Sequence, residues 1–491
     1  MSSIFSLIHS LTPSEKRYFK LYAQRQVQGR NTNYLKLFEA INNQENFDED
    51  ELLKKFRRET FVKQFSVAKN YLFTMLLKSL QEYNEDNFIE WKIRNMFLQV
   101  KILAGKGLDA DAARHIKKTK ELAMQYEYYY VIMDVLHIEK YLFGNFRIYR
   151  QTSEIFAAIV DEGLLAFKIA AVYNEVGYVW HYLTLLEQET GKKSFEQIKE
   201  EASKYVAVDC MKEEPPISYN AKFRYYASWS LYYNLINDQQ KNYECCRLCI
   251  LIREEQIEKQ PLQKMDPLAS YYNFLISCEK VDQWEKFEYY LQKIKRYEAP
   301  TIEVNIRRMH NYCRCGLMYY LHLQDYEKAN EIVNEYRTFF VDKKIQLRKD
   351  FKIYIEAACG LVCFFNKQYK EALYWWSDIL NKAPEQVELS SQAAVRLYLM
   401  MLHCEEETTE IMEYLAQQSK TFLKQVALYH EPESLFLKGM VAISAINTQK
   451  EKIAAFAKLH QQLNEIPISI SGNAVNRFIL NWLKQKLPEY I

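Results

Sequence analysis

Three cysteines close together in the chain are the first residues whose spacing could do chemistry. Cys245, Cys246 and Cys249 contain a C-x-x-C, the spacing of dithiol redox sites and of zinc knuckles. Such sites place the motif at the start of a helix or in a knuckle loop, whereas this one lies inside the helical run YECCRLCILI. The sequence has no second C-x-x-C that could complete a four-thiolate site. We therefore interpret these thiols as small buried residues of a helix.

A histidine and two further cysteines form a second candidate site. His310, Cys313 and Cys315 read H-x-x-C-x-C, again within a predicted helix. On a helix, His310 and Cys313 share a face but Cys315 points away, so the three do not converge on a metal. His403 adjoins Cys404, and adjacent residues on a helix do not face each other as a nucleophile and its base must.

Other catalytic signatures are absent from the sequence. It contains no phosphate-binding glycine loop, no H-E-x-x-H and no G-x-S-x-G. The GKG at 105–107 is too short to wrap a phosphate, and paired carboxylates such as Glu254 and Glu255 are common on solvated helices. We therefore predict no catalytic residue, no metal, no cofactor and no enzymatic activity. A hidden enzyme would instead require a deep pocket with a strongly perturbed ionisable group.

The composition favours a chain made of helices. Only 11 Gly and 10 Pro occur among 491 residues, less than about half the usual share of each. Both residues interrupt helices, so their scarcity predicts long helices joined by short turns. Alternation of apolar and polar residues is nearly absent, while 49% of the residues are apolar, enough for a continuous core. The predicted fold class is all-α.

The net charge and the lack of membrane or leader segments indicate where the protein is located. The net charge is +2, from 65 basic and 63 acidic residues, so no overall charge attracts the chain to nucleic acid or to an anionic membrane. No uncharged run reaches the roughly 18 residues of a membrane span. The start, MSSIFSLIHSLTPSEK, lacks a basic leader, and the ten cysteines lie in apolar helical segments. We expect a cytoplasmic protein that does not enter the membrane.

Residues 1–85 are predicted to form a separate N-terminal module of four helices. TPSE has the form of a capping box, with Thr12 as the cap, Pro13 at the first helical position and Glu15 reaching back. Asp48 and Glu51 indicate a second helix start. A long helix over about 61–83 is apolar at spacings of three and four residues.

A basic helix over 54–78 in this module suggests an alternative function. This stretch contains one acidic residue, Glu59, and seven basic residues: Lys54, Lys55, Arg57, Arg58, Lys63, Lys69 and Lys78. A short helix followed by a longer basic one is the arrangement of a helix-turn-helix DNA reader, with Lys63 and Gln64 placed to meet base edges. The other interpretation is a solvated charged face on a small bundle.

From residue 86 to residue 465 we predict an array of antiparallel helix pairs. A break lies near 213–216, where the chain reads EEPP, and a last helix within 466–491 is predicted to cap the array. The predicted pairs are 88–104 with 108–125, 127–143 with 147–161, 164–189 with 194–208, 219–237 with 241–258, 268–279 with 282–297, 304–322 with 325–341, 352–365 with 368–381, 388–404 with 408–428, and 433–446 with 449–464.

Aromatic residues at the start of successive second helices define the length of the repeat. Tyr243, Trp284, Tyr326 and Tyr369 are separated by 41, 42 and 43 residues. The clearest unit, 354–385, has a small residue in its first helix, an alanine in its second and a closing proline: Gly360, Ala372 and Pro384.

This pattern resembles the tetratricopeptide repeat, in the form found in uncharacterised bacterial repeat proteins. The resemblance implies a right-handed α-solenoid of about 8–9 helical hairpins. The chain departs from the family in its period, near 42 residues instead of 34, and in Cys246 and Phe287, which replace the alanine of the second helix.

The resemblance also implies where a partner binds. In that family the first helices line a concave groove that holds a peptide, so the function implied is a non-enzymatic scaffold or adaptor. The corresponding positions are Tyr272, Asn273, Asn311, Arg314, Met318, His322, Tyr354, Leu361 and Phe365. Arg314 could hold a peptide carboxylate with its two-pronged guanidinium. Longer helices would rotate these faces, and about half of the positions would then pack against the neighbouring repeat.

Two functions therefore stay open at this point. The first is a scaffold that binds a protein or peptide. The second is a regulator in which the N-terminal module binds DNA and the array acts as a sensor or oligomerisation domain. The sequence identifies neither the partner nor the oligomeric state.

Overall fold

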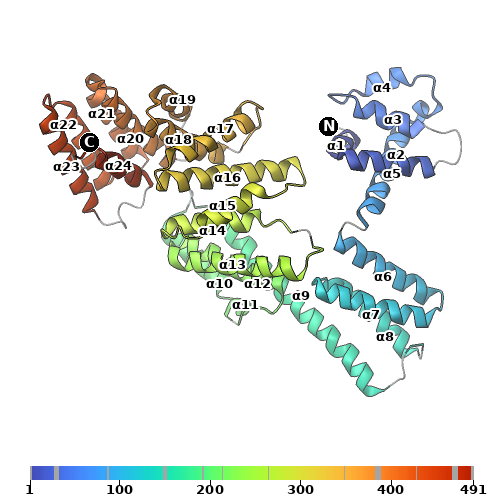
Figure 1. The fold of residues 1–491 in the computed structure, drawn as a ribbon. Coiled ribbons are helices and arrows are strands. Elements are labelled where there is room, and N and C mark those ends of the chain that lie inside the picture. Colours follow the sequence, from blue (N-terminus) through green and yellow to red (C-terminus); the bar gives the residue numbers. More distant parts are fainter. Residues whose placement is uncertain are drawn as a thin grey trace. The chain divides into compact units, whose positions relative to one another are not determined.

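Every regular element that the structure describes is a helix. The computed structural model describes residues 3–26, 33–85, 88–145, 147–148, 152–190, 193–212, 214–263, 265–347, 349–381, 389–426, 428–466 and 474–487. In these ranges 24 α-helices and no strand occur, which confirms the all-α class (Figure 1). The chain divides into two compact units, Met1–Asp266 and Pro267–Ile491, called unit 1 and unit 2 below. None of the described helices is both long and apolar enough to cross a membrane.

Unit 1 begins with a helical module that has its own core. Thr12 and Glu15 form the predicted capping box: the Thr12 N–H donates to Glu15 Oε2 (2.7 Å), and the Glu15 N–H donates to Thr12 Oγ1 (3.3 Å). The predicted cap at Asp48 is also confirmed, by a 2.9 Å bond from the Glu51 N–H. The helices are α1 (Ser3–Ser10), which was not predicted, α2 (Pro13–Gln26), α3 (Asn33–Asn42), α4 (Glu49–Lys55), the 3₁₀ turn η1 (Thr60–Gln64) and α5 (Phe65–Glu85).

The basic stretch 54–78 is not a single helix. It starts in the last turn of α4, crosses a turn and η1, and continues into α5. Phe56 and Phe65 are buried at the two ends of this connection and join it to the core of the module. Apolar burial therefore fixes the path of the chain between α4 and α5.

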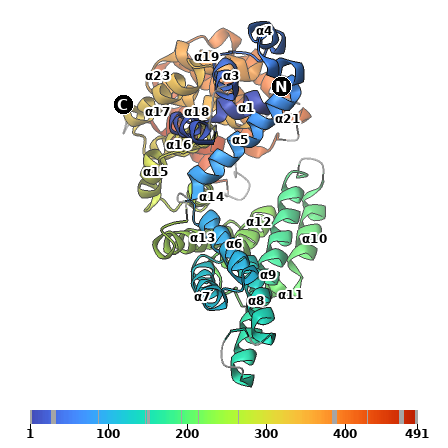
Figure 2. The same cartoon turned by 90° about the vertical axis from the view of Figure 1, so that its right-hand side faces the viewer.

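The rest of unit 1 consists of helices that pack neighbour to neighbour (Figure 1 and Figure 2). The second half of α9 and α12 pack closely, as do α12 and α13. The predicted break at 213–216 falls between α11 and α12. The helices are α6 (Ile89–Gly105), α7 (Asp109–Gln125), α8 (Tyr129–Gly144), α9 (Ser153–Glu187), α10 (Phe195–Val206), α11 (Asp209–Lys212), α12 (Tyr219–Leu235) and α13 (Gln239–Lys259).

Helix α9 is one continuous helix of 35 residues, so the turn predicted between 161 and 164 is wrong. Its first half contributes Ile159 and Ala166 to one apolar cluster, and its second half contributes Val176 and Leu183 to the next. A single glycine, Gly163, weakens a helix by only about 1 kcal/mol, which burial on both sides outweighs.

The described residues of unit 2 form five helix pairs and a last helix. The predicted pairs from 268 onward are all found, with ends shifted by a few residues. The helices are α14 (Leu268–Lys280), α15 (Phe287–Arg296), α16 (Ile302–His322), α17 (Tyr326–Tyr336), the π-helical turn η2 (Arg337–Val341), α18 (Lys349–Phe365), α19 (Tyr369–Leu380), α20 (Leu389–Glu405), the 3₁₀ turn η4 (Thr409–Ile411), α21 (Met412–Gln425), α22 (Glu431–Ser444), α23 (Gln449–Asn464) and α24 (Ala474–Lys484).

The first helices of these pairs pack against one another in order. α14 contacts α16, α16 contacts α18, α18 contacts α20, and α20 contacts α22. Successive second helices make fewer contacts with each other. The predicted closing residue Pro384 lies outside the described residues.

The same turn joins the two helices of several pairs. The second residue after the first helix has a positive φ at Asn237, Asp282, Gln324, Lys367 and Glu407. The next N–H then donates to a carbonyl five residues earlier, as in the 2.9 Å bond from Gln283 to Cys278 and the 2.8 Å bond from Gln368 to Cys363. This is the Schellman ending of a helix, here made without glycine. It returns every 40 to 45 residues.

Candidate functional site

Cys245 and the two cysteines of the C-x-x-C, Cys246 and Cys249, are all buried inside α13. Burial raises the pKa of Cys245 to about 12, and it raises the pKa of Cys249 well above that of a free thiol. Such thiols stay protonated at neutral pH, whereas the thiolate is the nucleophile and the metal ligand. Within the described ranges, no three His, Cys, Asp or Glu side chains are grouped so that they could hold a metal ion.

The second candidate, on α16, is also part of the core. His310 is buried and packs between the rings of Tyr272 and Phe351, at centroid distances of 5.9 and 4.5 Å. Cys313 and Cys315 are fully buried, and burial raises the pKa of both thiols, that of Cys315 to about 12. These residues therefore fill space between helices.

His403 and Cys404 do not form a nucleophile pair. The Nδ1 of His403 lies 2.9 Å from the hydroxyl of Thr408, in the turn after α20. Burial lowers the pKa of His403 and raises the pKa of Cys404 to about 11. The imidazole is therefore engaged in the turn and the thiol stays protonated.

The nine positions predicted to line a groove lie mostly between consecutive first helices. They do not form an open surface, because α14, α16 and α18 contact one another. Asn311, Met318 and Leu361 are buried, and Asn273 is the exposed member of the set. The other positions, all half-buried, are Tyr272, Arg314, His322, Tyr354 and Phe365.

Arg314 joins three of these helices. Its Nη1 lies 3.0 Å from Glu279 Oε2 on α14, and its guanidinium lies 4.0 Å from the centre of the Tyr354 ring on α18. Both charged side chains are nearly buried, at 13% and 15% exposure. The sequence predicted a peptide carboxylate as the partner of Arg314, and the structure provides a carboxylate of the same chain.

The ends of the first helices face α24. His322 stacks on Trp284 at 4.0 Å, and the guanidinium of Arg477 lies 5.6 Å from the Trp284 ring. Phe365 stacks on Tyr326 at 4.8 Å, and the Tyr326 hydroxyl accepts a 3.4 Å bond from Gln485. The chain's own last helix therefore covers this part of the predicted groove.

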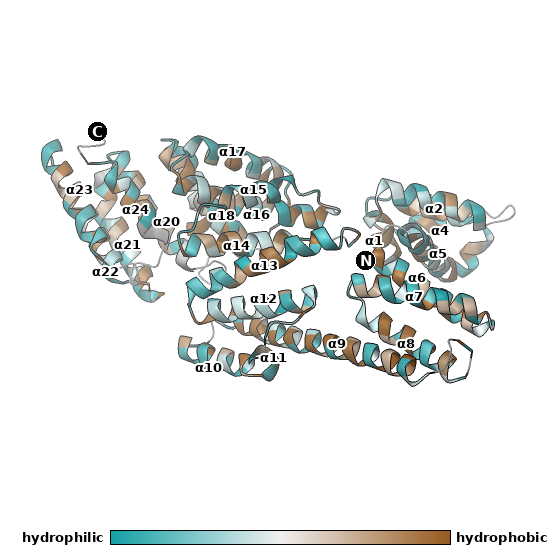
Figure 3. Cartoon of the chain, turned by 60° about the horizontal axis from the view of Figure 1, so that its bottom comes forward, coloured by the Kyte–Doolittle hydropathy of each residue, from teal (hydrophilic) through white to brown (hydrophobic). Residues whose placement is uncertain are grey.

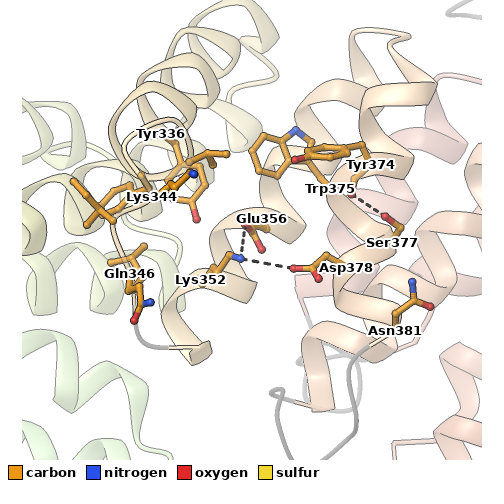
Figure 4. A pocket seen from close by; sticks show the side chains of 14 residues that line it. Tyr336, Lys344, Gln346, Lys352, Glu356, Tyr374, Trp375, Ser377, Asp378 and Asn381 are labelled. Carbon is orange, nitrogen blue, oxygen red and sulfur yellow. Dashed lines mark hydrogen bonds and ion pairs between the residues drawn. The ribbon is translucent and has the colours of Figure 1, made fainter.

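An open cleft of about 790 Å³ lies in unit 2 between α17, α18 and α19 (Figure 4). Its volume is enough for several residues of an extended peptide. It is lined by Tyr336, Phe340 and Val341 of α17 and η2, by Lys344, Ile345, Gln346 and Leu347 of the following turn, by Lys352 and Glu356 of α18, and by Tyr374, Trp375, Ser377, Asp378 and Asn381 of α19.

One wall of the cleft is a single face of α19. Tyr374, Ser377, Asp378 and Asn381 are spaced by three and four residues, so they point the same way (Figure 4). Tyr374 is 59% exposed, so its ring is accessible to a ligand in the cleft. This wall offers an aromatic ring, a carboxylate and an amide to a ligand.

The base of the cleft carries charges of both signs. The ammonium of Lys352 lies 3.5 Å from Glu356 Oε1 and 3.7 Å from Asp378 Oδ2 (Figure 4). The Glu356 side chain is only 7% exposed, whereas that of Asp378 is 56% exposed. Asp378 is therefore the carboxylate that a ligand reaches first.

The cleft has the composition of a binding site. The residues that line it include aromatic rings, lysines, carboxylates and amides, but no histidine and no cysteine. The sequence does not predict this cleft, because its walls come from three helices and a turn. The one available signal was the polar face of α19, which interrupts an otherwise apolar helix.

A smaller cavity of about 220 Å³ in unit 1 contains a perturbed carboxyl, Glu127. Burial raises the pKa of Glu127, and burial raises the pKa of Tyr128 beside it to about 12. The Glu127 carboxylate accepts bonds from the N–H groups of Tyr219 (2.5 Å) and Asn220 (2.9 Å) at the start of α12. It thus fixes a helix end, a structural role that explains its burial.

The cations of the N-terminal module are exposed. Lys54, Lys55, Arg57, Arg58 and Lys63 all face solvent, and within the described chain none lies within ion-pair distance of a carboxylate. Two neighbouring lysines are paired: Lys36 with Glu59 at 2.9 Å and Lys69 with Glu49 at 2.6 Å. The exposed side of α5 carries the apolar residues Val67 and Tyr71.

No protein-family model, curated protein or solved structure matches this chain.

Proposed function

We propose that this chain is a non-enzymatic scaffold that binds an extended segment of a protein partner in the cleft of unit 2. The observation that carries the proposal is the cleft itself, an open space of about 790 Å³ between two neighbouring helix pairs. Its lining suits recognition, because rings supply contact area and charged or amide groups select the ligand.

The scaffold is proposed to be a tetratricopeptide-like α-solenoid of about 8–9 hairpins, closed by α24. The ordered contacts between successive first helices support this proposal. The recurring Schellman turn supports it as well, because it marks equivalent points 40 to 45 residues apart. Stacked pairs of this kind expose long surfaces and depend on their neighbours for burial.

The chemistry of the cleft defines the ligand. Tyr374 provides a flat ring for an apolar or aromatic side chain. Asp378, at the edge of the Lys352 ion pairs, can accept a basic side chain. Lys344 and Gln346 face α19 across the cleft and can bond the backbone of the ligand (Figure 4).

Selection of peptides on the full chain tests this proposal. We expect a displayed random-peptide library to yield ligands that combine an apolar residue with a basic one. Binding of the selected peptides, measured by calorimetry, should weaken roughly tenfold in Tyr374→Ala and in Asp378→Asn, since a contact residue at the centre of a site contributes about 1.4 kcal/mol or more.

Tyr414→Ala is the matched control, because Tyr414 is an equally exposed tyrosine on α21, outside the cleft. It should leave the affinity unchanged. Peptides that bind the cleft variants as tightly as the wild type, or a library that yields no ligand, would count against the cleft as the binding site.

A second candidate function is nucleic-acid binding by the N-terminal module. It is favoured by the exposed cations Lys54, Lys55, Arg57, Arg58 and Lys63, for which no ion pair occurs among the described residues. It ranks second because α5, the helix that would enter the major groove, exposes the apolar residues Val67 and Tyr71.

Fluorescence anisotropy with labelled duplex DNA distinguishes this candidate. If it holds, affinity falls steeply with salt, and the variant with alanine at Lys54, Lys55, Arg57 and Arg58 shows a log–log salt slope shallower by about 3 to 4. Equal, weak binding by the wild type and the variant would exclude a specific role for the basic segment.

A further inference from the structure

Helix α9 exposes a stripe of large apolar side chains along most of its length. Leu164, Phe167, Tyr178, Tyr182 and Leu185 are between 51% and 63% exposed, and the half-buried Ala171 lies on the same line. Figure 3 shows the hydrophobic character of α9 over much of this length. Water-facing residues of a surface helix are normally polar, so this face is unusual.

These residues form one narrow line on the helix. At 3.6 residues per turn, the six side chains fall within an arc of about 60°, and the line from Leu164 to Leu185 is about 30 Å long. The buried residues of α9 lie on other faces, with Ala166 and Ala170 in the first half and Val176 and Leu183 in the second. The stripe is therefore a single surface of unit 1, flanked at one end by α10, whose Tyr205 ring stacks on Tyr182 at 5.0 Å.

The spacing of the stripe is the same in both directions. From Leu164 to Leu185 the successive intervals are 3, 4, 7, 4 and 3 residues. The midpoint lies between Asn174 and Glu175. A two-fold axis through this point brings each position of one helix level with an apolar position of an antiparallel copy.

We propose that the α9 stripe is the interface of a homodimer in which two copies of α9 pack antiparallel. Leu164 of one copy then meets Leu185 of the second copy, and Phe167 meets Tyr182. The small Ala171 faces the large Tyr178, which lets the two helices approach at the usual distance of 8–10 Å. Tyr130 of α8, which bonds Asn174, widens the face near its middle.

The second copy is the partner that this surface fits best. A stripe that is symmetric about its midpoint is complementary to itself, which a surface made for an unrelated protein need not be. The interface is small, essentially one helix face, so we expect a dimer that dissociates on dilution through the micromolar range. It does not depend on the cleft of unit 2.

One residue near the axis opposes association. Glu175 is exposed beside the stripe and comes close to Glu175 of the second copy. Two like charges at this distance weaken the dimer. The geometry therefore requires that Glu175→Gln tightens association, by about twofold on the scale of surface charge pairs.

Sedimentation velocity of the full chain over a range of concentrations tests the dimer. We expect the wild type to shift from dimer to monomer on dilution, and Phe167→Glu to remain monomeric, with unchanged circular dichroism. Tyr414→Glu is the control, since it places the same charge at another exposed apolar site. It should behave as the wild type. A wild type that is monomeric throughout, or a dimer unaffected by Phe167→Glu, overturns the proposal.

Cross-linking tests the antiparallel register. With a short bismaleimide, the variant carrying both Leu164→Cys and Leu185→Cys should form covalent dimers. Leu164→Cys alone should not exceed the wild-type background from the ten native cysteines, because its two copies lie about 30 Å apart. Efficient cross-linking of Leu164→Cys alone would indicate a parallel arrangement and overturn the proposal.

Discussion

Gly360→Ala is expected to destabilise unit 2 by about 2–3 kcal/mol, although alanine is the better helix former by about 1 kcal/mol. A Cβ at position 360 would lie 2.5 Å from two carbons of the Trp376 indole and closer still to its nitrogen. The indole has no room to move. It is fully buried, and its N–H donates to the Ala357 carbonyl at 3.1 Å.

Gly177→Ala is the matched control for this result. Gly177 lies inside α9, and a Cβ there meets nothing within 4 Å. The same substitution should therefore stabilise unit 1 by up to about 1 kcal/mol. Thermal unfolding followed by calorimetry should show the two changes with opposite signs. Wild-type stability of Gly360→Ala would mean that α18 and α19 do not cross at Gly360.

Arg314→Met is expected to cost about 3–5 kcal/mol, the usual effect of leaving one member of a buried ion pair without its partner. The charge of Glu279 would remain between α14 and α16, where the Arg314 guanidinium now neutralises it at 3.0 Å. The contact of the guanidinium with the Tyr354 ring would be lost as well. Urea unfolding of unit 2 measures the change.

The double variant Arg314→Met, Glu279→Leu separates the loss of the ion pair from the cost of leaving the Glu279 charge buried without a partner. Because it leaves no uncompensated charge, it should recover most of the lost stability. Lys204→Met removes a lysine from an exposed pair with Glu200 and should leave stability unchanged within error. A single variant Arg314→Met as stable as the wild type would show that this pair does not hold the first helices together.

Local signals in the sequence were sufficient for the helices and several of their ends. The Thr12–Glu15 box and the Asp48 cap depend on neighbours in the chain, so they could be predicted. The turns between paired helices were harder, because their left-handed residues include Gln324 and Lys367 instead of glycine. The continuity of α9 depends on burial against other helices, which no local pattern reveals.

The small residues predicted for the crossings of paired helices included Gly360 and Ala372 of the clearest unit. Gly316 and Gly439 occupy similar crossings, where a Cβ would press on Ile332 and Leu459. Their shared role was not visible, because the residues that they contact differ in type. The cleft could not be predicted for a related reason. The residues that line it come from several elements, and the distances between these elements depend on the packing of the whole array.

The position of α24 has a consequence for how unit 2 folds. Arg477 binds Asp282 in the turn of the first pair at 2.8 Å, across 195 residues, while Trp482 and Lys486 both bond Glu405 at the end of α20. A linear array with contacts only between neighbours can unfold from its ends, one repeat at a time. Contacts that join its first and fourth pairs remove that freedom. Unit 2 should therefore unfold in a single cooperative transition and refold slowly, since its last helix must be in place before the first pair is complete.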